Sequence, residues 1–358
     1  MDEYRDQALC QALVKKIGSL TCEDINLMEV CGTHTMAIFR EGLKDILPHN
    51  IHLISGPGCP VCVTPLSAID KMIALSRLNK TVITTFGDMM NVPGSSSNLK
   101  YEKARGATIK IVYSPFQALE IATQYPKKKI ILIGIGFETT TPLLASVVLE
   151  AKKRDLTNFY LLSYAKLMPP VMRALLADQK TKIDGFICPG HVSAIIGTQP
   201  YQFIPRDYHI PCVIAGFEPV DILFAIYRLV LQKVTGEPYV ENQYRRAVNT
   251  NGNRVALQKM KQVFQPANSQ WRGLGRIPFS GLELKAEYGP MNAHNIAIQV
   301  EPTQEHPDCC CGEVLRGLKT PLQCPLFKSV CTPENPVGAC MVSSEGSCAA
   351  YYKYNKHS

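Results

Sequence analysis

The sequence predicts an α/β protein: two tandem parallel-sheet α/β domains followed by a third, cysteine-rich iron–sulfur region. Three observations support this prediction. Short apolar runs rich in β-branched residues alternate with helical stretches, a proline lies at the start of each helical stretch, and seven of the fourteen cysteines fall between Cys309 and Cys348. Strands that alternate with helices are typical of parallel sheets, and proline is favoured in the first turn of a helix.

The elements follow one another along the chain in a regular order. The predicted strands are residues 51–55, 81–85, 109–113, 130–134, 159–162 and 185–188. The predicted helices are residues 65–78, 142–153, 170–178 and 219–231. Taken in sequence order, these elements predict an N-terminal helix (1–21) that packs on the C-terminal region, two α/β domains (22–123 and 124–233), and a helical, cysteine-rich domain (234–358).

Composition excludes several classes of protein. The amino end has mixed charge, without the basic and then apolar layout of a signal peptide, and no apolar run approaches the ~20 residues that span a bilayer. The net charge of +8 is dispersed, so we expect neither a nucleic-acid groove nor membrane binding. We expect a cytoplasmic protein in a reducing compartment, where clustered cysteines favour metal binding or catalysis over structural disulfides.

The first cysteine group contains Cys31, followed closely by His34, and then the pair Cys59 and Cys62. A thiol near the start of a helix has a lowered pKa, so the pair could cycle between dithiol and disulfide. The alternative is that the pair only caps a turn. Cys31 has a polar neighbourhood that suits a soft metal or a nucleophile, with His34 as base, second ligand or hydrogen-bond donor.

Two carboxylates follow predicted strands, at the sheet edge where α/β proteins form their sites. Asp88 follows the strand 81–85, and Glu138 follows the strand 130–134. Each could serve as an acid, a base or part of a metal shell. Each could equally cap the helix that follows it, and His191 is similarly ambiguous.

The tail offers four cysteines for one metal centre: Cys311, Cys324, Cys331 and Cys348. Thiolate tetrads bind either zinc or an iron–sulfur cluster. The wide, irregular spacing favours [4Fe–4S] over zinc, and a disulfide framework is the least favoured alternative. Cys340 could replace Cys348 as the fourth ligand.

Six ordered motifs carry a family resemblance that spans nearly the whole chain. They are Cys-Gly-Thr-His-Thr at 31–35, Gly-Pro-Gly-Cys-Pro-Val-Cys at 56–62, Thr-Thr-Phe-Gly-Asp-Met-Met at 84–90, Gly-Phe-Glu-Thr-Thr-Thr-Pro at 136–142, Pro-Gly-His-Val at 189–192 and Met-Val-Ser-Ser-Glu-Gly at 341–346. In these motifs the chain resembles the hydrogenase maturation factor HypD family. One departure is Asn91, at a position where we expect a basic residue in the family.

The resemblance implies a scaffold on which the Fe(CN)₂CO unit of [NiFe]-hydrogenase is assembled. It implies that Cys31 holds the iron, with its CN and CO ligands, as transient cargo together with a cysteine of the chaperone HypC. Cyanide would come from HypE, and the hydrogenase large subunit would be served indirectly. Cys59 and Cys62 would be the redox-active pair, and a [4Fe–4S] cluster would lie in the carboxy-terminal region of a three-domain α/β protein.

Two other functions compete with this one. The first is a thiol-disulfide oxidoreductase that uses Cys59 and Cys62 and carries a purely structural cluster. The second is a binding module stapled by zinc. Whether the scaffold is itself an enzyme stays open.

Overall fold

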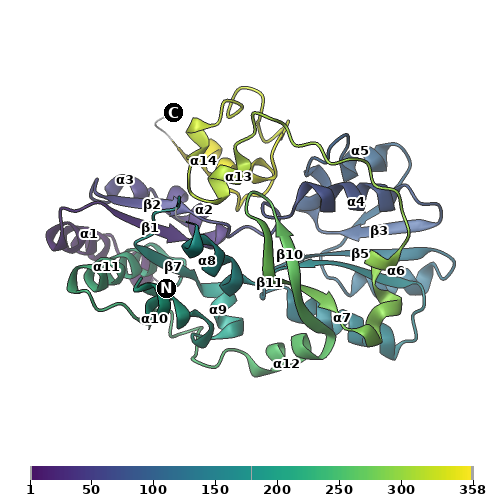
Figure 1. Cartoon of the computed structure of the whole chain (residues 1–358), viewed down its shortest axis with the longest axis horizontal. Helices are drawn as coiled ribbons and strands as arrows, with labels where there is room; N and C mark the ends of the chain where they lie inside the picture. The colour runs from purple at the N-terminus through teal and green to yellow at the C-terminus, as the bar shows by residue number, and fades with distance from the viewer. Residues whose placement is uncertain (1, 179, 356–358) are drawn as a thin grey trace.

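The computed structural model describes residues 2–178 and 180–355, which form two parallel sheets, one β-hairpin and a cysteine-rich tail (Figure 1). The predicted fold class is thereby confirmed. Met1 and residues 356–358, at the ends of the predicted first and last segments, lie outside the described residues. Within the described ranges, no helix has the length and apolar character needed to cross a membrane.

Sheet A has five parallel strands in the order β2 (Ile51–Ser55), β1 (Ile25–Glu29), β7 (Gly185–Pro189), β8 (Cys212–Ala215) and β9 (Val240–Asn242). One face is covered by α1 (Gln7–Leu20), α2 (Gly32–Arg40) and α11 (Pro219–Thr235), whose apolar residues share a core with the strands. Because β1 lies between two partners, the chain that leaves its carboxyl end is held by the sheet on both sides.

Sheet B has four parallel strands in the order β4 (Thr108–Ile111), β3 (Thr81–Thr85), β5 (Lys129–Gly136) and β6 (Phe159–Ala165). The helices α4 (Leu66–Ser76) and α5 (Leu99–Ala104) cover one face, and α6 (Gln117–Gln124), α7 (Thr141–Lys153) and α12 (Arg254–Val263) cover the other. Helices on both faces explain why β5 is an almost continuous apolar run.

The predicted domain boundaries need correction. Sheet A combines strands from before and after sheet B, since Leu27 of β1 is in register with Gly185 of β7. The ranges 22–123 and 124–233 therefore do not separate the two sheets. Apolar runs reveal strands but not their partners, so grouping by sequence order failed.

The predicted position of the N-terminal helix is also wrong. It does not pack on the C-terminal region: α1 packs on α11, on the outer face of sheet A. The reason is an apolar stripe of Cys10, Leu13 and Ile17 at helical spacing, which buries itself against α11.

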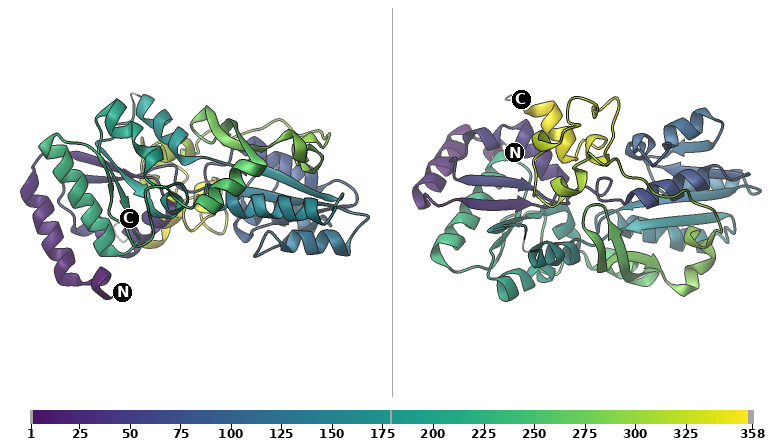
Figure 2. Two further views of the ribbon diagram at one scale, coloured as in Figure 1. Left: turned by 90° about the horizontal axis from the view of Figure 1, so that it is seen from below. Right: turned by 45° about the horizontal axis from the view of Figure 1, so that its top comes forward.

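The third region is only partly helical. After α12, an antiparallel hairpin of β10 (Phe264–Trp271) and β11 (Gly275–Leu284) leads into a strap, residues 297–308, without helix or strand. The tail contains α13 (Cys311–Leu315) and α14 (Ser347–Tyr354), and it sits between the two sheets on one side of the molecule (Figures 1 and 2). The remaining helices are α3 (Leu43–Ile46), α8 (Met168–Ala177), α9 (Gly190–Ile196) and α10 (Phe203–Tyr208).

Candidate functional site

Three motifs that are far apart in the sequence meet at Cys31. This residue follows β1 and is the N-cap of α2. The amide of Gly32 donates to the carbonyl of Gly58, at 3.1 Å. A side chain on Gly58 would overlap the backbone of Cys31, and one on Gly32 would overlap Glu345. The loops 56–62 and 343–346 therefore contact Cys31 closely, and glycine is required where they cross.

Two carboxylates flank Cys31. Glu29 is buried at the end of β1. Its Oε2 accepts a hydrogen bond from the Cys31 amide at 3.1 Å, and its Oε1 accepts one from the Thr35 hydroxyl. Glu345 of the tail accepts a hydrogen bond from the Thr33 hydroxyl at 2.8 Å. Cys31 thus lies between an acid from sheet A and an acid from the tail.

Burial controls the protonation of this group. Burial, with a smaller contribution from the nearby charge of Glu345, raises the pKa of the Cys31 thiol to about 12. Burial also raises the pKa of Glu29 to about 8. Cys31 is 8% exposed. Without a bound cation the thiol is neutral at pH 7, whereas a metal ion favours the thiolate and so releases a proton.

His34 lies behind the thiol, in the interior. Its Nε2 donates to the carbonyl of Gly216 at 2.8 Å, and its buried Nδ1 has no hydrogen-bond partner among the described residues. Burial lowers the pKa of His34 to about 4, so the ring is neutral at pH 7. Phe217 separates His34 from His191, with ring centroids 4.6 Å and 4.0 Å away. His34 can therefore offer one lone pair, on Nδ1, to a proton or a metal.

Cys59 and Cys62 form a disulfide in the loop between β2 and α4. Both are buried, and the Cys62 amide donates to Cys59 Sγ at 3.2 Å. Cys62 Sγ lies 3.9 Å from the carbonyl oxygen of Ala339. Since Ala339 precedes Cys340, the disulfide lies beside the cysteines of the tail.

The seven tail cysteines surround one small, largely apolar cavity, which we term the sulfur-rich cavity. They are Cys309, Cys310, Cys311, Cys324, Cys331, Cys340 and Cys348. The four predicted ligands are thus brought together, and the open alternative, Cys340, lies among them. Its sulfur is 2.7 Å from that of Cys311, and it also contacts Cys348.

A thiol-lined cavity of this kind suits a soft metal or an iron–sulfur cluster. No three Cys, His, Asp or Glu side chains within residues 2–178 and 180–355 converge in the way that a single metal ion requires. Ligands of a four-iron cluster need not converge, because each thiolate binds a different iron. The donor set therefore fits a cluster.

Asp88 and Glu138 have different surroundings. Asp88 is exposed after β3 and accepts a hydrogen bond from the Ser343 hydroxyl at 3.2 Å, so it is linked to the tail loop that carries Glu345. Glu138 is buried, and its Oε1 accepts from the amide of Met168, the first residue of α8, at 2.9 Å. Its Oε2 has no partner in the described part of the chain, and burial raises its pKa to about 7.

Sequence reasoning missed some of these groups. Glu29 was not singled out, although a carboxylate that closes a short apolar run just before Cys31 is a usable signal. Glu345 lay inside a quoted motif without a role. Arg272, whose charge lies close to the Cys311 and Cys340 thiols, carries no recognisable signal because it lies in a polar stretch.

Comparison with known proteins gives one consistent result. The family model described as "HypD: Hydrogenase formation hypA family" matches residues 8–355. The "Hydrogenase maturation factor HypD" of Escherichia coli (strain K12) is 44% identical over 99% of this chain and 98% of the relative. The proteins of the same name from Cupriavidus necator and Rhizobium leguminosarum bv. viciae are 42% and 44% identical, over 99% of this chain and 97% and 95% of the relatives.

These matches cover the Cys31 motif, the disulfide motif and the sulfur-rich cavity in one alignment, and they confirm the family resemblance seen in the sequence motifs. The chain belongs to the HypD family of hydrogenase maturation factors.

Proposed function

We propose that this chain is the cytoplasmic scaffold on which the Fe(CN)₂CO unit of [NiFe]-hydrogenase is assembled. Cys31 binds the iron cargo, a cysteine of HypC supplies a second thiolate, HypE delivers cyanide, and the hydrogenase large subunit is the final recipient. One observation carries this proposal: Cys31, the disulfide loop and the tail loop of Glu345 converge at one sheet edge.

The surroundings of Cys31 support cation binding. The thiol is neutral when no metal is present, so iron binding must displace its proton. Glu29 holds the Cys31 amide, and Glu345 holds Thr33. These bonds fix the loop, and the charge of Glu345 lies near the cation. Glu29, whose pKa burial raises to about 8, would gain its negative charge when a bound cation favours the ionised form. Low-spin Fe(II) with strong-field CN and CO ligands is compatible with thiolate ligation.

The Cys59–Cys62 pair supports a redox role at the same site. Reduction of the Cys59–Cys62 disulfide takes two electrons and two protons and gives two thiols. Both sulfurs are buried, which favours electron exchange within the protein over attack on protein substrates. Four tail cysteines, Cys311, Cys324 and Cys331 with Cys348 or Cys340, would hold a [4Fe–4S] cluster. When bound, such a cluster supplies one-electron redox chemistry.

Infrared spectroscopy of the protein isolated with HypC tests the assignment of Cys31. Bound CN and CO absorb where protein does not. We expect the Cys31→Ala variant to lack these bands and to keep the iron–sulfur absorbance of the tail. Cys22→Ala, which removes an exposed thiol shortly before β1, is the matched control and should keep the bands. Cyanide-bearing iron on Cys31→Ala would refute the assignment.

The Cys59–Cys62 disulfide is also compatible with the alternative function, a thiol-disulfide oxidoreductase. An oxidoreductase needs Cys62 but not Cys31, whereas the scaffold needs both. Comparing Cys62→Ala with Cys31→Ala in disulfide-reductase and maturation assays separates the two functions. For the zinc-stapled module, iron and sulfide analysis after anaerobic purification is decisive, because that module contains neither iron nor sulfide.

A further inference from the structure

Arg272 places a buried positive charge at a position that the proposed chemistry does not use. It follows β10 and is 7% exposed. Its amide donates to Val63 O at 2.9 Å, and its Nε donates to Thr64 O at 3.0 Å. Its buried Nη2 has no hydrogen-bond partner in residues 2–178 and 180–355. Leaving a charged donor unsatisfied is unfavourable, so this nitrogen points to a ligand.

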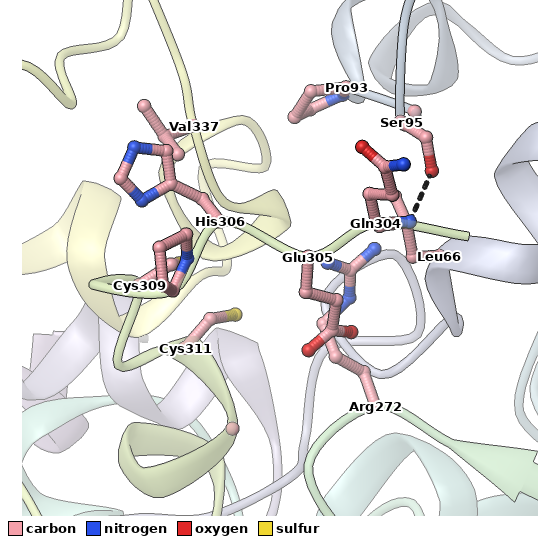
Figure 3. A pocket seen from close by; sticks show the side chains of 13 residues that line it. Leu66, Pro93, Ser95, Arg272, Gln304, Glu305, His306, Cys309, Cys311 and Val337 are labelled. Carbon is pink, nitrogen blue, oxygen red and sulfur yellow. Dashed lines mark hydrogen bonds between the residues drawn. The ribbon is translucent and has the colours of Figure 1, made fainter. Parts of the chain in front are cut away.

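Arg272 lines a pocket of about 360 Å³. Arg272, Leu66 and Cys311 are its buried residues, and Cys309 also lines it. Figure 3 shows the Arg272 side chain rising into the pocket beside Glu305, with the Cys311 thiol pointing inward. A molecule bound here would lie beside the sulfur-rich cavity.

The rim of this pocket is held in place by hydrogen bonds. The Gln304 amide of the strap donates to the Ser95 hydroxyl at 2.9 Å (Figure 3). The Ser95 amide and hydroxyl donate to the buried Asp70, at 2.7 and 2.8 Å, and the Thr303 hydroxyl donates to Asp70 at 3.1 Å. The strap is therefore tied to the loop after β3, and the pocket is a built feature of the fold.

We propose that this pocket binds a small monocarboxylate on Arg272. Because Nε is engaged by Thr64, the edge formed by the two Nη groups remains, and its parallel N–H groups match the two oxygens of a planar carboxylate. The polar side chains of Ser95, Gln304 and His306 line the same pocket. Glu305 at the rim disfavours ligands with more than one negative charge. The site does not include Cys31. A failure of the carboxylate proposal would therefore not contradict the scaffold proposal, and the reverse also holds.

Titration with ¹³C-labelled acetate tests the site on the protein as purified anaerobically, with broadening of the acetate NMR signal as the readout. We expect saturable binding with Kd on the order of 1–10 mM, and weakening by about tenfold or more in Arg272→Met. Arg276→Met removes an exposed arginine of the same hairpin and should bind acetate as the wild type does. Equal binding by Arg272→Met and the wild type would overturn the proposal.

Two further variants keep the test decisive. If circular dichroism shows that Arg272→Met does not fold, Arg272→Lys keeps the charge but loses the paired Nη groups, and should still weaken binding; unchanged affinity would refute the carboxylate geometry. Glu305→Gln should bind acetate slightly more tightly. Should only Glu305→Gln bind acetate, with the wild type empty up to about 100 mM, the natural occupant of Arg272 would be Glu305 and the proposal would be wrong.

Discussion

Cys31 stands at the end of a strand that sheet A holds on both sides, whereas the seven tail cysteines lie on short helices and turns around a cavity. The hydrogen bonds that hold Cys31 in place, to the Glu29 carboxylate and to neighbouring backbone groups, form without any cofactor. The tail has few apolar runs of its own, so under the proposed function a bound cluster would supply its cross-links. The difference teaches that strand pairing and hydrogen bonds position Cys31, whereas under the proposed function the tail depends on a bound group.

The largest expected effect follows from this dependence. Cys331→Ser should lose bound iron and sulfide, and amide hydrogen exchange in residues 309–354 should accelerate by about 100-fold or more, because the cross-links of the tail are lost. Amides of β1 and β5 should exchange as before. Cys22→Ser is the control. If the tail amides of the iron-free variant were still fully protected from exchange, the proposed difference between the two regions would be wrong.

The second effect concerns the buried acid beside Cys31. The pKa of Glu29 is raised from 4.5 to about 8 by burial, so the folded protein holds a proton that the unfolded chain has lost between these pH values. Stability should fall as pH rises through this window, by about 5 kcal/mol in total. Denaturant unfolding of Glu29→Gln and wild type at several pH values checks this.

Glu29→Gln should lack that decline. The opposite slope from His34, whose pKa is lowered, cancels when the two proteins are compared. If both show the same pH dependence, the carboxylate is ionised in the folded state and the Cys31 site is less closed than described.

The third effect tests how rigidly the fold holds Cys31. A methyl group on Gly58 would overlap the backbone of Cys31 and Val30, which cannot yield as a side chain can. Gly58→Ala should reduce the free energy of unfolding by about 2 kcal/mol and weaken iron loading. At Gly87 an added methyl group meets no atom within 4 Å, so Gly87→Ala should change stability by less than about 0.5 kcal/mol. Similar values for both variants would show that the loops are loosely joined.

The smallest effect measures the link between the two regions. Thr33→Val removes the hydroxyl that donates to Glu345 and should cost about 1 kcal/mol. Faster hydrogen exchange should be confined to residues 343–346 and the start of α2. Thr123→Val, which removes a hydroxyl bonded within its own helix, should leave that segment unchanged. An unaffected tail loop would mean that Glu345 is held by other contacts.

Sequence patterns predicted local structure well where burial was strong. The predicted strands 81–85 and 130–134 fall on β3 and β5, which are almost entirely buried, because β-branched apolar residues mark buried strands. The hairpin β10–β11 was missed, since most of β10 and about half of β11 is exposed or half-buried and reads as polar. Strand β1 was missed because Asn26 and Glu29 interrupt its apolar run.

Site residues could be predicted where a sequence motif indicates a specific chemistry. Cys31 lies beside the loop that carries Cys59 and Cys62, and the tail cysteines surround one cavity. Contacts between distant segments could not be predicted from the sequence, because only the tertiary fold brings Glu345 and Ala339 close to the site. Spacing alone could not rank Cys340 against Cys348, because both lie within reach of the same neighbours.

The insertion of sheet B between β2 and β7 has a consequence for biosynthesis. All strands of sheet B leave the ribosome before β7 does, so this sheet can form during translation while β1 still lacks one neighbour. The loop of Glu345 emerges after every strand of the two sheets. The nascent chain therefore cannot assemble the surroundings of Cys31 until the strands of both sheets have left the ribosome.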